Sequence, residues 1–270
     1  MKLKNLNLSI CEENGEVFFN IDIPEIAPVE QAEEKSPTVE IAPQIKTESC
    51  LFNYGWCTSP LGLNIRETTD LECKVIGVLD NGQRFKIENV IEANEKRWYE
   101  ISLPMKGFID AEFTAVCEDT TEVNEDLINF TASWESFRPR AYRDAGGEWT
   151  IGFGDCTFDD EPTYTVTYDE AWNTLKTTLN NFASQVAELT QGLNLNQNEF
   201  NALVDFCYNL GVRSLKESNL FQYIKECQSN AVIIPAFDIW DGCDGRQLEG
   251  LERRRQAEAN MFLYGQYDNN

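Results

Sequence analysis

The chain has 270 residues, of which 42% are hydrophobic, and a formal net charge of −24. This length and apolar content predict a folded protein with one large domain or two smaller ones. The acidic excess argues against nucleic acid and anionic membranes as partners, because both would repel the chain. No apolar run approaches the length of a membrane span, and the N-terminus lacks the apolar core of a secretory signal. We therefore expect synthesis in a cytoplasm and no membrane insertion.

Residues 1–24 alternate apolar and polar side chains on either side of Asn14-Gly15, which predicts an N-terminal β-hairpin. A lone hairpin is marginally stable in water, so we interpret it as an attachment segment that docks on something else. Residues 25–50 contain three of the nine prolines and many glutamates, which is typical of a linker.

Residues 51–118 have an all-β pattern. Turn residues such as Asp80-Asn81-Gly82 separate short apolar runs, and these runs predict strands at 63–65, 74–79, 84–87, 98–101 and 107–109. So many strands in so short a segment suggest a small barrel. The runs LNIRETTDLECKVIGVLDNGQRFKI, RWYEI and GFIDAEF resemble the bacterial Src-homology-three-like family. That resemblance implies either binding of wall peptides or attachment to another protein, and both alternatives stay open.

Helical patterns dominate the remaining segment, residues 119–270. Apolar spacing, capping residues and a terminating glycine predict helices at about 127–134, 167–189, 196–210, 214–227, 231–241 and 249–264. Between the first two helices, residues 141–144 and 149–151 are strand-like arms around a glycine turn, which predicts a hairpin. The whole chain is thus expected to be multidomain: a small all-β barrel followed by an α+β, mainly helical domain with a β-hairpin lobe.

The chain has nine cysteines and no histidine, which limits the kinds of catalytic and metal site it can form. No cysteines are spaced as C-x-x-C, so we predict no metal site and no cofactor. The cysteines are interpreted as reduced and mostly buried, as in a protein folded in a cytoplasm. Catalysis, if present, must then use carboxylates and hydroxyl groups.

Two carboxylates and a hydroxyl surround the predicted hairpin. Glu135 ends the first helix, Asp144 lies at the mouth of the hairpin, and Thr150 lies on its return strand. If the hairpin folds back on the helix, these three side chains face one cleft. Paired carboxylates on either side of a gap are what hydrolysis of a glycosidic bond requires. Apolar Trp134 and Phe137 suit Glu135 to the acid role, and a more solvated Asp144 suits the base role.

The stretch WESFRPRAYRDAGGEWTIGFGD, residues 134–155, resembles the signature of phage-type lysozymes, the muramidases used as endolysins. Glu135, Asp144 and Thr150 match their Glu-x8-Asp-x5-Thr triad in type and spacing. LNQNEFNALVDFCYNLG and GLERRRQAEANMFLYG resemble two further motifs of the family. The resemblance covers about residues 124–265 and implies a lysozyme-like fold for this half of the chain.

The resemblance also implies an activity. Phage-type lysozymes hydrolyse the β-1,4 bond between N-acetylmuramic acid and N-acetylglucosamine in peptidoglycan, with inversion. Carried over, Glu135 is the general acid, Asp144 the base or water-positioning carboxylate, and Thr150 the partner that holds the water. Inversion predicts a separation of about 6.5–9.5 Å between the two carboxyl groups. Asp155 replaces the family histidine and Ser136 a glycine; we expect altered packing beneath the cleft rather than lost activity.

Arg254 is the one of three successive arginines that is in phase with Leu251, Glu258 and Phe262 on the expected inner face of the last helix. We expect it either to reach Glu135 or to brace Glu258 as a structural ion pair.

Two function classes remain open: an active muramidase, and a structural or wall-binding phage protein with a decayed lysozyme domain. For an active enzyme, two biological settings remain open. It is either carried on the virion, with residues 1–118 attached to tail or virion proteins, or it is an endolysin that a holin releases. In both, the chain is made in the host cytoplasm without a signal peptide and acts on the cell wall. The charge of −24 favours attachment, because an anionic wall would repel a free enzyme.

Overall fold

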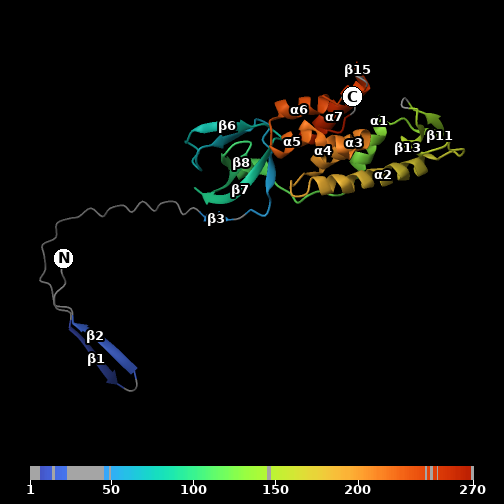
Figure 1. Ribbon diagram of the computed structural model, residues 1–270. Coiled ribbons are helices and arrows are strands. Elements are labelled where there is room, and N and C mark those ends of the chain that lie inside the picture. Colours follow the sequence, from blue (N-terminus) through green and yellow to red (C-terminus); the bar gives the residue numbers. More distant parts are fainter. Residues whose placement is uncertain are drawn as a thin grey trace. The chain divides into compact units, whose positions relative to one another are not determined.

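The computed structural model describes residues 7–13, 16–22, 46–48, 50–144, 147–240, 242–243, 246–247 and 249–268. The chain divides into two compact units, Met1–Ala42 and Pro43–Asn270 (Figure 1). Within the described ranges, no helix combines the length and the apolar character needed to cross a membrane.

The first unit contains an antiparallel hairpin. Strand β1 (Asn7–Glu13) pairs along its whole length with β2 (Glu16–Asp22). The alternating pattern predicted both strands, and they are confirmed. The predicted turn at Asn14-Gly15 lies outside the described residues, as does most of the predicted linker.

The second unit begins with an antiparallel sheet. Its strands are β3 (Lys46–Glu48), β4 (Tyr54–Cys57), β5 (Leu63–Arg66), β6 (Val75–Leu79), β7 (Arg84–Ala93), β8 (Lys96–Leu103), β9 (Gly107–Asp110) and β10 (Thr114–Ala115). A 3-10 turn, η1 (Ala111–Phe113), connects β9 to β10. The strands follow the order β10-β4-β7-β8-β9-β5-β6, and β3 pairs with β7 outside that path.

The five predicted strands are present, but closure of the sheet into a barrel is not confirmed. Among the described residues the pairing path is open, with β10 and β6 at its two ends. Strands β7 and β8 are longer than predicted because they form a hairpin around Asn94-Glu95, whose φ values are 52° and 61°. Positive φ at both central residues is the type I′ feature that fits the twist of paired strands. The short strand β3 lies inside the segment expected to be linker.

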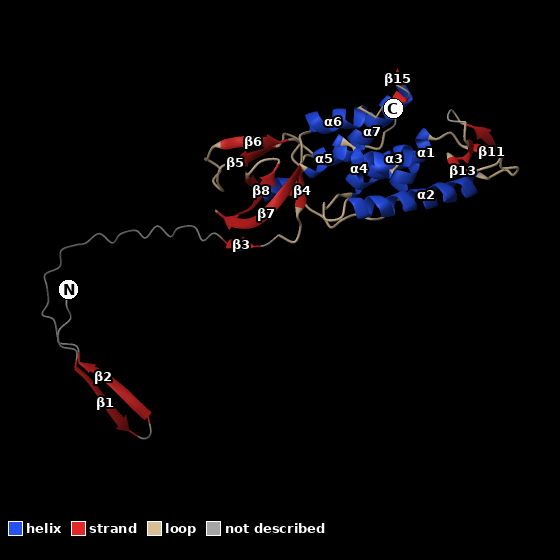
Figure 2. Ribbon diagram, viewed as in Figure 1, coloured by secondary structure: helices blue, strands red, loops and turns tan. Residues whose placement is uncertain are grey.

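Helices dominate the rest of the second unit (Figure 2). They are α1 (Glu125–Trp134), α2 (Tyr168–Leu189), α3 (Gln197–Leu210), α4 (Val212–Glu217), α5 (Asn219–Lys225), α6 (Asn230–Asp238) and α7 (Glu249–Tyr264). A three-stranded sheet between α1 and α2 consists of β11 (Arg138–Arg143), β12 (Trp149–Gly152) and β13 (Asp155–Phe158). A small hairpin of β14 (Gly242–Cys243) and β15 (Arg246–Gln247) precedes α7.

Local sequence signals set the ends of α2 and α3. Thr167 and Glu170 form a reciprocal capping box at the start of α2, and Asn196 and Glu199 form one at the start of α3. Gly211, with a φ of 83°, ends α3. All three predictions are confirmed. These signals are reliable because each depends on residues only three or four positions apart.

The segment predicted as one helix over 214–227 is divided at Ser218. The backbone of Ser218 is extended, which ends α4, and its hydroxyl accepts a hydrogen bond from the N–H of Phe221, which caps α5. The single-helix prediction is therefore wrong, because an N-cap inside the apolar pattern was overlooked.

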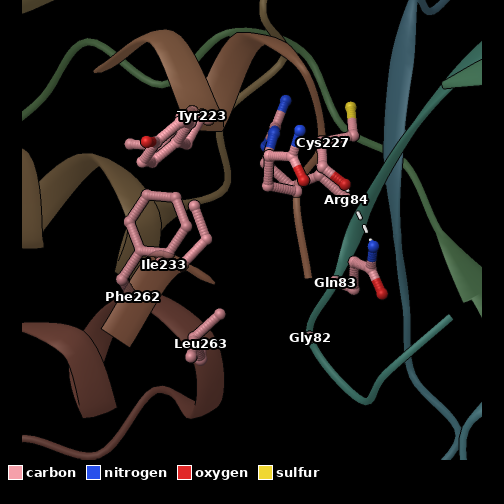
Figure 3. A pocket seen from close by; sticks show the side chains of 10 residues that line it. Gly82, Gln83, Arg84, Tyr223, Cys227, Ile233, Phe262 and Leu263 are labelled. Atoms are coloured by element: carbon pink, nitrogen blue, oxygen red, sulfur yellow. Dashed lines mark hydrogen bonds between the residues drawn. The ribbon is translucent and has the colours of Figure 1, made fainter. Parts of the chain in front are cut away.

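A buried ion pair joins the sheet of β3–β10 to the helices. Arg84 Nη1 donates to Glu199 Oε2 at 2.6 Å, and both side chains are almost fully buried. The same oxygen accepts the N–H of Asn196 at 2.8 Å, so the carboxylate that caps α3 also binds β7. Nearby, Gln83 Nε2 donates to the carbonyl oxygen of Cys227 at 3.0 Å (Figure 3). We call this region the junction.

Gly82 faces α7 across the junction, opposite Leu263 (Figure 3). Its φ is 78°, and a Cβ there would lie 2.2 Å from the carbonyl oxygen of Leu263. We expect Gly82→Ala to lower the free energy of unfolding by more than the ~1–2 kcal/mol that left-handed backbone alone costs a residue with a Cβ. The additional loss arises because two backbones collide.

Gly192→Ala is the matched control for Gly82→Ala. The φ of Gly192 is 80°, and nothing lies within 4 Å of the position its Cβ would take. Urea denaturation of both variants measures the two costs. Equal losses would contradict the close approach at the junction.

Candidate active site

Glu135 lies where α1 ends. Its N–H bonds to the carbonyl oxygen of Ala132, and its extended backbone, with φ −100° and ψ 127°, turns the chain away from the helix. Leu127, Ile128 and Phe130 bury the inner face of α1 in the helical core. Packing of the helix therefore fixes the position of Glu135, whose side chain is 24% exposed.

The hairpin of β11 and β12 positions the other two predicted residues. Asp144 Oδ1 accepts the N–H of Glu148 at 2.8 Å, and the N–H of Asp144 donates to the carbonyl oxygen of Glu148 at 3.0 Å. Thr150 lies opposite Tyr142 in the hairpin and is buried, and its hydroxyl donates to the same carbonyl oxygen at 3.3 Å. The turn thus holds the carboxylate and the hydroxyl in a fixed relation.

One cleft of about 710 Å³ brings these residues together. Glu135, Asp144 and Thr150 all line it, with further walls from β13, α2 and α3. Asp155, which replaces the family histidine, begins β13 opposite Ile151 and also lines the cleft. Further lining residues that carry polar or sulfur groups were not predicted as site residues; they include Tyr142, Cys156, Tyr208 and Asn209.

Arg254 contacts both of the partners considered for it and one more. Its Nη1 donates to Glu135 Oε1 at 2.8 Å, and its Nε lies 3.7 Å from Glu258 Oε1. Its principal partner is Asp205, to which Nε and Nη2 donate at 2.9 and 3.0 Å. Asp205 was missed, although a carboxylate inside the apolar run Leu203–Cys207 of α3 is a signal for a buried polar partner.

Electrostatics keep the Asp205–Arg254 pair charged. Burial alone would raise the pKa of Asp205, but Arg254 and the hydroxyl of Thr131, at 2.7 Å, hold that pKa below its ordinary value. Burial alone would lower the pKa of Arg254. The negative charge of Asp205 has the larger effect, so the pKa of the guanidinium is raised. By contrast, burial raises the pKa of the neighbouring Glu258 carboxyl well above its usual range. The charged Asp205–Arg254 pair therefore holds Glu135 in place through the hydrogen bond that Arg254 donates to it.

The depressed pKa of Asp205 predicts acid sensitivity. The folded-state pKa lies below the unfolded value of about 3.9, so ionised Asp205 stabilises the fold at neutral pH and this contribution is lost as the pH falls through the folded-state pKa. We expect the free energy of unfolding to decline below about pH 4. Asp205→Asn should be less stable at pH 7 and should show a flatter decline.

Urea denaturation at a series of pH values tests the role of Asp205. The exposed carboxylate of Asp268 supplies the control, because Asp268→Asn should keep the wild-type acid dependence. An unchanged acid profile in Asp205→Asn would show that other groups cause the decline.

Known proteins resemble the helical half of the chain. Residues 132–258 match the family model for phage lysozyme. We call this matched range the lysozyme-like domain. It includes every predicted site residue, from Glu135 to Arg254.

Curated proteins similar to the lysozyme-like domain include endolysins. The endolysin of Bacillus phage B103 is 32% identical over 149 residues, which are 54% of this chain and 56% of that protein. The endolysin of Bacillus phage PZA is 30% identical over 146 residues, or 53% of this chain and 56% of that protein. The chain thus spans about half the length of these curated relatives. Among solved structures, the endolysin from Escherichia coli O157:H7 phage FAHEc1 is 24% identical; the match covers 56% of this chain and 99% of that chain, with a TM-score of 0.47.

Proposed function

We propose that the lysozyme-like domain is a muramidase, which hydrolyses the β-1,4 bond between N-acetylmuramic acid and N-acetylglucosamine in peptidoglycan. The observation that carries this proposal is the position of Glu135, Asp144 and Thr150 on the walls of a single cleft. Their types and spacing are those of the lysozyme triad that the sequence resembles. The endolysin relatives support the same substrate class.

The proposed roles are those that the resemblance to phage-type lysozymes implies. Glu135 gives its proton to the glycosidic oxygen as the bond to the anomeric carbon breaks. A water molecule adds to that carbon from the opposite face, and Asp144 accepts the proton that the water loses. Thr150 holds this water with its hydroxyl. The anomeric centre inverts, and the carboxyl separation expected for inversion is about 6.5–9.5 Å.

Arg254 is a positioning residue in this proposal. It holds Glu135 Oε1 at 2.8 Å, and the other oxygen, Oε2, lies 3.4 Å from the position of a Cβ on Gly154 in the cleft wall. One carboxyl oxygen is therefore fixed in the protein while the other faces the cleft. That arrangement aims the acid at a bound substrate.

Product analysis tests the proposed reaction. Purified protein is incubated with peptidoglycan sacculi, and the fragments are examined by mass spectrometry and by NMR of the newly formed anomer. Inverted, reducing muramic acid ends are expected. Anhydromuramic acid ends would indicate a lytic transglycosylase, which needs one acid only, and intact sacculi would indicate a structural or wall-binding protein with a decayed lysozyme domain.

Two settings fit this activity. Release as a lysis endolysin is supported by the names of the relatives. Attachment to the virion through residues 1–118 is supported by the charge of −24, which hinders free diffusion to an anionic wall. Binding of wall peptides by the Src-homology-three-like segment would serve either setting. Mass spectrometry of purified virions separates them, since an attached enzyme is found in the particles.

A further inference from the structure

A second groove, of about 390 Å³, lies beside the junction. Its walls come from four places: residues 56–58 at β4, Asn81 and Gly82 between β6 and β7, Asn196 and Asn198 at the start of α3, and residues 262–266 at the end of α7. None of the described residues that line it is charged, although charged residues make up 25% of the chain. The groove therefore suits a neutral, polar ligand.

The amide groups in this groove are held in place by the fold. The side-chain oxygen of Asn196 accepts the N–H groups of Asn198 and Glu199, as the cap of α3. The side-chain oxygen of Asn198 accepts the hydroxyl of Tyr267 at 2.9 Å, and its Nδ2 points at Gly265 in the groove wall. With both oxygens engaged, each amide presents its NH2 donors. Fixed amide donors beside an aromatic ring match the hydroxyl groups and C–H faces of sugars.

Hollows that share lining residues link the groove to the catalytic cleft. The cleft shares Glu135 and Asn209 with a neighbouring hollow, and that hollow shares Ser133 with the next one. This third hollow shares Asn198 and Gly265 with the groove. Asn198 and Asn209 both belong to α3, so the path follows that helix for roughly 16 Å at about 1.5 Å per residue. We call the whole path the track.

We propose that the track binds the neutral glycan strand of peptidoglycan beyond the catalytic cleft, with Trp56 as its far aromatic contact. The inference rests on the proposed function, since it assumes that the substrate is a glycan. Stem peptides fit the groove less well, because their charged groups would find no opposite charge among its lining residues and their carboxylates would be repelled by the acidic chain. Charged residues do line the hollows between groove and cleft, including Asp126, Arg253 and Arg254. A residue outside the lysozyme-like domain thus takes part in substrate binding.

Calorimetry on the full chain tests this proposal, with Glu135→Gln introduced to prevent turnover. The ligands are long, uncrosslinked peptidoglycan strands, a disaccharide-peptide that occupies the cleft alone, and the free stem peptide. Trp56→Ala should weaken binding of the long strand about tenfold, the order expected when an aromatic contact is lost. It should leave binding of the disaccharide-peptide unchanged.

Three further variants make the result decisive. Phe113→Ala removes another exposed aromatic side chain of the same sheet region and should not change affinity. Trp56→Phe keeps an aromatic face and should restore most of the affinity. Gln266→Glu places a charge at an exposed position of the groove, where it cannot disturb packing, and should weaken binding of the long strand.

Equal long-strand affinities for Trp56→Ala, Gln266→Glu and Phe113→Ala would overturn the proposal, and so would a loss confined to the stem peptide. Because calorimetry measures binding without turnover, failure of the proposed hydrolysis would be seen separately, in the product analysis of the wild-type chain.

Discussion

Glu135→Gln is expected to slow peptidoglycan cleavage by about 10³-fold, within the range that general acid catalysis contributes. Glutamine keeps the size of the side chain and an oxygen that can accept the Arg254 hydrogen bond, but it has no proton to give to the leaving oxygen. The variant should therefore fold normally but cleave peptidoglycan far more slowly. Zymograms and the rate of appearance of reducing ends measure the loss.

Glu148→Gln is the matched control for this prediction. Glu148 belongs to the turn that holds Asp144, but its side chain is exposed and it is not part of the cleft lining. The control should clear peptidoglycan at the wild-type rate. If Glu135→Gln also clears normally, Glu135 is not the acid.

Arg254→Met is expected to lower the free energy of unfolding by about 3–5 kcal/mol, the usual result of removing one partner from a buried ion pair. Methionine fills much of the space but leaves the carboxylate of Asp205 buried without its cation. It also releases Oε1 of Glu135, so activity should fall even at temperatures where the variant is folded. Urea denaturation gives the first effect, and cleavage rates at low temperature give the second.

The preceding residue, Arg253, provides the control for Arg254→Met. Arg253 is exposed on α7, so Arg253→Met removes the same positive charge without touching the buried network. Its stability should stay close to that of the wild type. Equal destabilisation by the two variants would mean that net charge, and not the contacts of Arg254, is responsible.

Elements whose signals are local could be predicted from the sequence. The capping boxes at Thr167 and Asn196, the alternating strands of β1 and β2, and the end of α1 at Glu135 all depend on neighbours within a few residues. The four-residue strands β4 and β13 were not predicted.

The candidate site was predictable only in part, because only some of its residues belong to local sequence patterns. Motif spacing identified Glu135, Asp144 and Thr150, and helical phase identified Arg254. Asp205 was not identified, because its importance depends on Arg254, 49 positions away along the chain, and no local pattern links the two. Long-range pairing of this kind follows from tertiary packing alone.

The side chain of Glu199 contributes both to a helix cap and to a tertiary contact. Its carboxylate completes the first turn of α3 and at the same time binds Arg84 of β7. In an isolated lysozyme-like domain this carboxylate would have no cation beside it, and in an isolated segment 51–118 the guanidinium of Arg84 would be exposed. Residues 51–118 therefore cannot be exchanged freely for another β-rich segment, because a replacement would have to bring its own arginine to the same place.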